Sequence, residues 1–277
     1  MLKFDSTIYP YPSRRNVMYA KNGMVATGSP LAAQAGLEIL KKGGNAIDAA
    51  IATAAALTVV EPTGNGIGGD GFAILSVKDK IYGLNASGPS PKLIEAQELL
   101  NKGLKAMPKY GLIPVTVPGI PKAWAELSKK FGKLPLSEVI APAVKLAREG
   151  YAVPVNVAKL WKKAAVNFGK EEGEEFKPWF DTFTQDGKCP EIGDVVRLPD
   201  HADTLEMIGD TYADAFYKGE LADKIDAFSK KYNGYLRKDD LEEFEAEWVE
   251  PISVKYHGYD VYELPPNGHG ISALMAL

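Results

Sequence analysis

The segment "AIDAAIATAAALTVV", residues 46–60, constrains the fold of this chain more than any other feature. It is rich in alanine and apolar on nearly every side, and a helix without a polar face is normally buried. Asn45 stands where a helix N-cap is expected, and Glu61-Pro62 ends the pattern because the residue before a proline avoids the helical conformation. We therefore predict a buried helix over residues 46–60, with small side chains that permit very close packing against a sheet.

A glycine-rich loop, "TGNGIGGDG", follows this helix and satisfies the spacing of a dinucleotide-binding motif twice. Such a loop must follow a strand and open a helix, so that the helix amides face the pyrophosphate. Here the glycines follow a helix and precede the strand-like run "FAILSV", so we reject the nucleotide interpretation. The loop either leads tightly into a buried strand or also forms one wall of a catalytic cleft, lined by Gly68, Gly69 and Asp70. Asp70 is either the cap of a turn or a catalytic carboxylate.

Helical and strand-like patterns alternate along the rest of the chain, without an internal repeat. We interpret residues 1–23 as an extended lead-in, residues 24–26 as a short strand, and the charged stretch over residues 169–200 as a surface excursion. We predict helices over residues 30–42, 92–100, 121–131, 137–148, 155–169, 204–209, 219–232 and 239–244, strands over residues 72–77 and 81–86, and a hairpin in "ISVKYHGYDVYEL". The length leaves room for one large domain or two modest ones.

Composition and charge argue against several classes of protein. The net charge is −4, with acids and bases mixed along the chain, so no basic surface indicates nucleic acid or an anionic membrane as a partner. No apolar run reaches the roughly 18 residues of a membrane helix, and the N-terminus lacks a signal-peptide pattern. We expect a cytoplasmic protein, or a secreted one whose signal has been removed. The single cysteine, Cys189, cannot form an internal disulfide, and we interpret it as a free thiol in a loop.

The sequence offers few candidates for chemistry. Its three histidines, His201, His257 and His269, do not have the spacing of metal ligands, so we predict no metal site. His257 falls in the turn of the hairpin, whereas His269 falls in the glycine turn "NGHG", where it is a candidate for lining a cleft. No residue in a known motif provides a nucleophile. The sequence ends at Leu277 in "GISALMAL", one or two turns into an apolar helix, which indicates either a frayed tail or a piece of something longer.

Four blocks of the sequence together resemble one protein family. They are "GMVATGSPLAAQAGLEILKKGGNAIDAAIATAAALTVVEPTGNGIGGDGFAIL", "VPGIPKAWAELSKKFGKLPLSEVIAPAVKLAREGYAV", "YADAFYKGELADKI" and "WVEPISVKYHGYDVYELPPNGHG", in the family's order. The chain strongly resembles the large-subunit part of gamma-glutamyltranspeptidases and their acylase relatives. The resemblance implies an α+β fold, the αββα sandwich of N-terminal nucleophile hydrolases. Residues 1–277 are then a single domain, the large-subunit half, which is completed by a second segment or chain.

The resemblance also implies a mechanism. The family precursor cuts itself, and the new N-terminal threonine of the small subunit is the nucleophile. We therefore expect no catalytic residue in this chain, and we expect the threonine to lie beyond Leu277. The threonine hydroxyl attacks the carbonyl of a small-molecule amide, with its own α-amine as the base. The acyl group then passes to water or to an acceptor amine, without a cofactor.

The same resemblance implies a partner. The expected partner is a small subunit or C-terminal half that begins with this threonine, in a heterodimer or a higher oligomer.

One loop departs from the family pattern. In gamma-glutamyl enzymes, the loop that matches "LNASGPSP" carries an arginine that binds the α-carboxylate of the substrate. Asn85, Ser87 and Gly88 stand in this loop here, and none of them is a cation. Neutral residues cannot form the bidentate pair of an arginine with a carboxylate. We assign the three residues to substrate binding, where Asn85 and Ser87 either bind a differently placed polar group or hold a turn.

Several functions remain open at this point. The first is cleavage of a gamma-glutamyl amide, of the glutathione type, by an assembled hydrolase or acyltransferase. The missing arginine favours a second, a family member that acts on another acyl amide as an acylase does. A third is a non-catalytic module that binds a ligand or a protein through the same cleft. A nucleotide-dependent oxidoreductase is favoured only by the glycine spacing.

Overall fold

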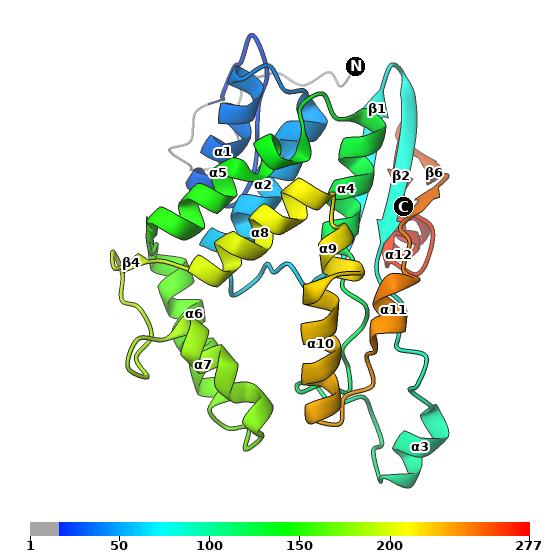
Figure 1. Ribbon diagram of the computed structural model, residues 1–277. Coiled ribbons are helices and arrows are strands. Elements are labelled where there is room, and N and C mark those ends of the chain that lie inside the picture. Colours follow the sequence, from blue (N-terminus) through cyan, green and yellow to red (C-terminus); the bar gives the residue numbers. More distant parts are fainter. Residues whose placement is uncertain (1–16) are drawn as a thin grey trace.

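The computed structural model describes residues 17–277, and Figure 1 shows their arrangement. Most of the predicted lead-in lies outside the described residues, and residues 17–23 form no helix or strand. The predicted strand at residues 24–26 is wrong, because this segment has no ladder partner among the described residues. Val25 packs instead on the first helix, where a Cβ added to Gly36 would lie 3.1 Å from Val25 Cγ1.

Helices account for most of the regular structure. They are α1 (Pro30–Lys41), α2 (Ala46–Val60), α3 (Ala96–Asn101), α4 (Ile120–Phe131), α5 (Leu136–Glu149), α6 (Val155–Phe168), α7 (Lys177–Phe183), α8 (Pro199–Thr211), α9 (Asp214–Tyr217), α10 (Glu220–Lys231), α11 (Lys238–Glu242) and α12 (Gly270–Ala276), with a 3₁₀ turn at Glu174–Phe176. A helix is present at each predicted place, although α3 begins four residues later than predicted and α8 is longer than predicted. α8 begins at Pro199, because a proline is compatible with the first turn of a helix. Helices α1, α2, α5 and α8 pack together on one side of the molecule (Figure 1).

The helix α2 is buried along most of its length, as predicted. Its small residues permit direct helix contact, because a Cβ on Gly36 of α1 would lie only 2.3 Å from Thr53 Oγ1. The main neighbours of α2 are α1, α4 and α5, so it packs within the helical layer rather than flat on a sheet. Small side chains on α2 therefore set the thickness of this layer.

The start of α2 is fastened by a reciprocal cap. The Asn45 side chain accepts hydrogen bonds from the backbone amides of Ile47 and Asp48, at 2.9 and 3.0 Å. The fully buried Asp48 carboxylate accepts in return from the Asn45 amide at 2.9 Å and from the Lys133 amide at 3.1 Å. Asn45 Nδ2 also donates to Phe131 O at 2.6 Å, which joins α2 to the end of α4. These bonds satisfy amides that a helix start otherwise leaves unpaired.

Three antiparallel strands form the main sheet, in the order β1-β2-β5. β1 (Gly71–Val77) pairs with β2 (Lys80–Ala86), so that Gly71 faces Ala86 in the ladder. β2 pairs on its other side with β5 (Glu247–Val249). The two predicted strands are confirmed, while the short β5 was not foreseen. Within the described residues, the outer edge of β1 has no partner strand.

The two faces of this sheet differ in their covering. On one face α4 contacts β1 and β2, and Leu84 of β2 is fully buried. On the other face, Phe72 and Ile74 of β1 remain 47% and 43% exposed. Asn85 lies on that second face too, because it stands opposite Phe72 in the ladder and side chains alternate along a strand. The described residues therefore leave one sheet face open to a further layer.

The chain ends in a hairpin, a turn and a short helix beside this sheet. β6 (Ile252–Tyr256) and β7 (Tyr259–Glu263) form the predicted hairpin, and His257 lies in its turn with a φ of 48°. Leu264 then packs on β2, where a Cβ on Gly83 would lie 2.6 Å from Leu264 Cδ2. This contact holds the turn before α12 against β2, and Figure 1 shows α12 close to the sheet.

The apolar segment "GISALMAL" is helical, as predicted. α12 runs over Gly270–Ala276, and Leu277 follows it with an exposed side chain. None of the residues of α12 is buried, so this apolar helix is not covered by the rest of the described chain. The threonine that we expect beyond Leu277 lies outside the described residues and stays a prediction.

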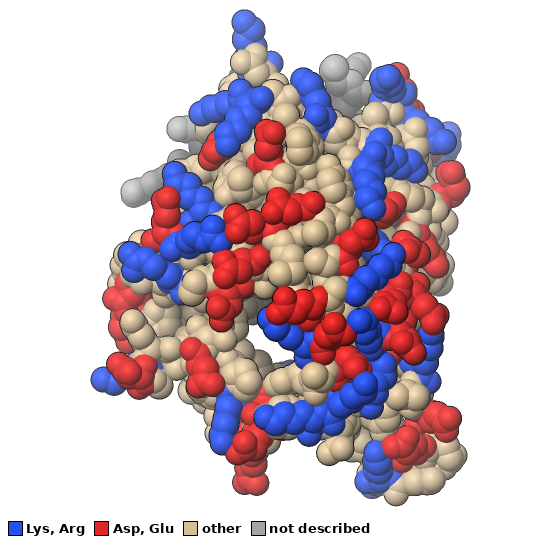
Figure 2. Space-filling model, viewed as in Figure 1, with Lys and Arg blue, Asp and Glu red and all other residues tan. Residues whose placement is uncertain are grey.

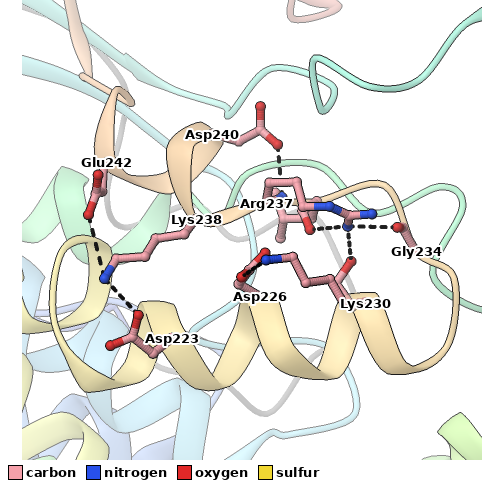
Figure 3. Close-up of polar contacts among 10 residues, drawn as sticks. Asp223, Asp226, Lys230, Gly234, Arg237, Lys238, Asp240 and Glu242 are labelled. Atoms are coloured by element: carbon pink, nitrogen blue, oxygen red, sulfur yellow. Dashed lines mark hydrogen bonds and ion pairs between the residues drawn. The ribbon is translucent and has the colours of Figure 1, made fainter.

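A polar cluster joins α10 to α11, and Figure 3 shows its side chains. Lys238 Nζ donates to the Asp223 carboxylate at 2.6 Å, from α11 to α10. The buried Asp240 carboxylate accepts from the backbone amides of Arg237 and Lys92, at 2.9 and 3.0 Å. Because exposed ion pairs contribute little, the buried Asp240 bonds are the main anchor of this corner.

Residues 169–200, predicted as a surface excursion, contain more regular structure than a loop. They include α7 and β4 (Val195–Val196), which pairs with β3 (Tyr151–Ala152). Trp161 of α6 is almost fully buried, and its Nε1 donates to Phe183 O of α7 at 2.8 Å. Aromatic packing between α6 and α7 therefore orders a segment whose charged composition suggested a loop.

The surface carries acids and bases side by side on the face seen in Figure 2, in agreement with the mixed charge of the sequence. The same view shows an opening between the α6–α7 unit and α10. Across the described part of the chain, no helix has both the length and the apolar character needed to span a membrane.

Candidate functional site

The cleft closest to the predicted site residues lies between β1, the end of β7 and the turn that leads into α12. Its volume is about 530 Å³, and it is lined by Asp70, Phe72, Ala73, Ile74, Glu263, Leu264, Asn267, Gly268, His269 and Gly270. Asp70 and His269, predicted from opposite ends of the sequence, are thus brought together. Gly68 and Gly69 do not line this space. Because the cleft adjoins the unpaired edge and the open face of β1, a further segment has access to it.

Two acids and one histidine are the titratable groups of the cleft lining. Asp70 and His269 are exposed, and neither side chain forms a hydrogen bond or an ion pair with another described residue. The turn-cap interpretation of Asp70 therefore has no hydrogen bond to support it. Glu263 lies over the start of α12, where a Cβ on Gly270 would lie 2.5 Å from Glu263 Oε2. The lining includes no lysine or arginine, so its fixed charge is negative.

The glycine loop before β1 has the order predicted from the sequence, with helix α2 before it and a strand after it. Gly69 O accepts hydrogen bonds from the amides of Gly119 and Ile120, at 2.9 and 3.0 Å, and so holds the start of α4. Gly68 is exposed, and a Cβ there or on Gly66 would meet nothing within 4 Å. Contacts among the described residues do not explain these two glycines, so their backbone is open to close approach from outside.

The loop after β2 is anchored by close backbone packing. A Cβ on Gly88 would lie 1.8 Å from Val117 O, and Val117 N donates to Pro89 O at 3.0 Å. A Cβ on Gly119 would likewise lie 1.6 Å from Ala86 O. Gly88, predicted to bind substrate, is therefore a glycine because the chain approaches itself here.

Asn85, Ser87 and Asn267 form a closed ring of hydrogen bonds, here called the amide ring. Asn85 Oδ1 accepts from Ser87 N at 2.9 Å and from Ser87 Oγ at 2.8 Å. Asn85 Nδ2 donates to Asn267 Oδ1 at 2.8 Å, and Asn267 Nδ2 donates to Ser87 Oγ at 2.8 Å. The ring joins the end of β2 to the turn before α12 and contains no charge.

Asn267 is the member of the amide ring that was missed in the sequence. It stands in "PPNGHG", the same turn as His269, and it lines the cleft directly. Asn85 and Ser87, which were singled out, lie behind Asn267 and are not among the cleft-lining residues. The only sequence signal for Asn267 was its place in that turn, because its partners lie about 180 positions earlier in the chain.

Two other side chains of reactive type, His201 and Cys189, lie away from the cleft lining. Thr58 Oγ1 donates to Ala55 O at 2.7 Å and lies 3.0 Å from His201 Nε2, so the imidazole N–H donates to the hydroxyl. Burial lowers the pKa of His201 from 6.5 to about 4, which keeps the ring neutral at ordinary pH.

Burial also raises the pKa of the Cys189 thiol, so the thiol is protonated at neutral pH. Among residues 17–277, no three His, Cys, Asp or Glu side chains gather as metal ligands.

Comparison with known proteins addresses the identity of the chain directly. The sequence profile of gamma-glutamyltranspeptidase matches residues 32–277. The chain belongs to the gamma-glutamyltranspeptidase family. A relative in this family, the glutathione hydrolase-like YwrD proenzyme of Bacillus subtilis (strain 168), is 36% identical over 92% of this chain and 48% of its own length. The glutathione hydrolase proenzyme of Escherichia coli (strain K12) is 34% identical over 91% of this chain and 43% of its own length.

Solved structures of the gamma-glutamyltranspeptidase family confirm the fold. A cephalosporin acylase from Bacillus halodurans matches with a TM-score of 0.94 and 56% identity, over 99% of this chain and 52% of that one. Helicobacter pylori gamma-glutamyltranspeptidase matches with a TM-score of 0.85 and 32% identity, over 92% and 73% of the two chains. The α+β fold of N-terminal nucleophile hydrolases is thus confirmed. The chain spans about half the length of the curated relatives that it matches.

Proposed function

We propose that this chain is one part of a two-part amide hydrolase or acyltransferase, whose nucleophile is a threonine beyond Leu277. The observation that carries the proposal is the composition of the cleft. No serine, threonine or cysteine is among the ten residues that line it, although the loops around it are tightly anchored. The half-length match to proenzymes supports the same division, with the nucleophile on the remaining part.

The surface beside the cleft supports a large partner segment. Phe72 and Ile74 expose apolar side chains on β1, and Met275 is 81% exposed on α12, whose first residue lines the cleft. Apolar residues that flank a cleft and an unpaired strand edge are typical of a surface that another layer covers. The proposed occupant is the segment that begins with the threonine, which would complete the second sheet of the sandwich.

The chemistry of the proposed reaction needs only groups of the amino-acid backbone and the threonine. The α-amine takes the proton of the threonine hydroxyl, and the oxygen attacks the amide carbonyl to form a tetrahedral oxyanion. Backbone amides that bind such an oxyanion lower the barrier by about 3–4 kcal/mol for each donor. The amine product leaves with a proton, and water or an acceptor amine then takes the acyl group from the threonine oxygen. In this scheme the described chain binds and orients the acyl group.

The substrate class has two candidates within the family. The first is a gamma-glutamyl amide, as the names of the glutathione hydrolase relatives suggest. The second is a different acyl amide, and two observations favour it. The loop of residues 85–89 has no cation, and the chain is 56% identical to a cephalosporin acylase.

Substitution of the threonine that begins the partner segment tests the proposal. In the assembled protein, Thr→Ala at that position should abolish amide cleavage, while Thr→Ser should retain part of it because a hydroxyl remains. Release of p-nitroaniline from acyl anilides measures the effect. Full activity of the Thr→Ala protein, or amide cleavage by residues 1–277 alone, would contradict the proposal.

A further inference from the structure

Asn267 is the point where the amide ring meets the cleft. We infer that Asn267 is the specificity-determining residue at the acyl-binding end of the cleft, where it selects acyl groups without a carboxylate beside it. The inference rests on the amide-cleaving function proposed above. Asn85 and Ser87 are then positioning residues, which act by holding the Asn267 side chain.

The amide ring fixes the orientation of the Asn267 side chain. Because Asn85 Oδ1 accepts two bonds from Ser87, Asn85 Nδ2 is the atom that donates to Asn267 Oδ1. Asn267 Nδ2 must then donate to Ser87 Oγ. Asn267 Oδ1 also lies 3.1 Å from Ser87 Oγ, so both sides of this oxygen are occupied within the ring. One N–H of the Asn267 amide remains for the cleft, since a carboxamide carries two N–H groups. This remaining N–H suits an uncharged group that accepts a hydrogen bond.

The supports of the amide ring are rigid. The backbone of Gly88 packs directly on Val117, and that of Gly119 packs directly on Ala86, with no room for a Cβ at either glycine. On the other side, Leu264 is buried on β2 and holds the turn that carries Asn267. The ring is therefore part of a fixed wall, so its polarity acts on whatever binds beside it.

The charges around Asn267 disfavour a substrate carboxylate. Asp70 and Glu263 line the same cleft, and its described lining has no lysine or arginine to balance them. A carboxylate bound here would lose its water shell without gaining a cation, in the field of two like charges. An acyl group without a carboxylate avoids this cost of desolvation and repulsion. An acyl group that carries an ammonium is also attracted to Asp70 and Glu263.

Four anilides that share one leaving group test the inference in the assembled enzyme. The butyryl, 4-aminobutyryl, glutaryl and gamma-glutamyl derivatives of p-nitroaniline differ only in the amine and the carboxylate of the acyl group. We expect kcat/KM for each acyl group without a carboxylate to exceed that of its carboxylate counterpart by about tenfold. The pairs to compare are butyryl with glutaryl, and 4-aminobutyryl with gamma-glutamyl.

Substitutions of the amide ring then separate specificity from folding. Asn267→Ala should raise KM for 4-aminobutyryl anilide about fivefold, with a smaller change in kcat, because binding at the acyl end is lost. Asn85→Ala should act in the same direction, whereas Asn267→Lys should favour the two carboxylate substrates. Asn101→Ala is the matched control, an exposed and hydrogen-bonded asparagine on α3, and it should leave all four values unchanged.

Two results would overturn the inference while leaving the proposed function intact. One is a wild-type preference for the glutaryl and gamma-glutamyl substrates. The other is an Asn267→Ala protein that keeps its melting temperature and all four kinetic profiles. Failure to cleave any of the four anilides would instead count against both the inference and the amide-cleaving function, and the Thr→Ala and Thr→Ser proteins would show which of them fails.

Discussion

Two small groups of glycines in this chain have opposite surroundings. Gly36 and Gly119 lie where the chain touches itself, and a Cβ on Gly119 would be 1.6 Å from Ala86 O. Gly66 and Gly68 face space in which a Cβ would meet nothing within 4 Å. The first group is explained by packing within the described residues. Packing within the described residues does not explain the second group, and we place the partner and the substrate at this loop.

The largest expected change in stability comes from removing the buried carboxylate of Asp48, compared with the exposed carboxylate of Asp70 in the cleft. Asp48→Ala should lower the free energy of unfolding by about 3 kcal/mol, because it removes the buried carboxylate that accepts from the backbone amides of Asn45 and Lys133. Asp70→Ala should change it by less than about 0.5 kcal/mol, since Asp70 is exposed. Urea unfolding of the two variants measures the difference. Equal losses of stability would mean that the contrast between the two regions is wrong.

The next effect is a pH dependence of stability that comes from His201 in helix α8. The pKa of His201 is about 4 in the folded protein, against 6.5 for an exposed histidine. The unfolded chain therefore binds a proton first as the pH falls, and stability should decrease by about 2.5 kcal/mol between pH 6.5 and pH 4. Below about pH 3, where His201 is protonated in both states, this contribution stays constant.

His201→Gln is the matched variant for this pH effect. Glutamine can still donate to Thr58 Oγ1 but does not titrate, so its melting temperature should depend less steeply on pH between 6.5 and 4. Thermal unfolding of both proteins across that range gives the comparison. Parallel curves for wild type and variant would show that His201 is not the source.

A pair of glycine substitutions sharpens the comparison of the two groups. Gly36→Ala should destabilise the protein by about 1–2 kcal/mol, because its Cβ would lie 2.3 Å from Thr53 Oγ1 and push α1 from α2. Gly68→Ala should leave stability within about 0.5 kcal/mol of wild type, yet reduce amide cleavage by the assembled enzyme. Denaturant unfolding and an anilide assay measure the two effects. A fully active Gly68→Ala enzyme would remove the reason to place a ligand or partner at this loop.

The smallest expected effect is a gain of function in the loop after β2. Ser87→Arg should raise kcat/KM for a gamma-glutamyl anilide several-fold, because it introduces a cation able to pair with the α-carboxylate. Ser87→Ala is the control, since it disturbs the same hydrogen bonds without adding a charge. No gain with arginine would mean that the loop does not face the substrate carboxylate.

Much of the helical side was predictable from local sequence. The limits of α1, α2, α4 and α5 follow from apolar periodicity, caps, prolines and terminal glycines, all of which lie within each segment. The strand at residues 24–26 was wrong because an apolar run does not reveal whether a partner strand exists. α7 was missed within residues 169–200 because its order depends on aromatic contacts with α6, which the charged local composition conceals.

The site was less predictable, for a related reason. Asp70 and His269 were expected to line a catalytic cleft; both lie on the lining of one cleft, whose catalytic role stays a prediction. Asn267 escaped notice because its role comes from hydrogen bonds to Asn85 and Ser87, far away in the sequence. The family resemblance indicated which loop to inspect, but only the fold shows which side chain of the amide ring reaches the cleft.

The central claim is that this chain forms one wall of a cleft that a threonine-bearing segment completes. Intact-mass measurement of the purified assembled protein, with sequencing of the N-terminus of every chain in it, tests this claim most directly. We predict a second chain whose first residue is threonine, bound to this one in equal amounts. A single unprocessed chain that cleaves amides, or a partner that begins with a residue bearing no hydroxyl or thiol, would contradict the account.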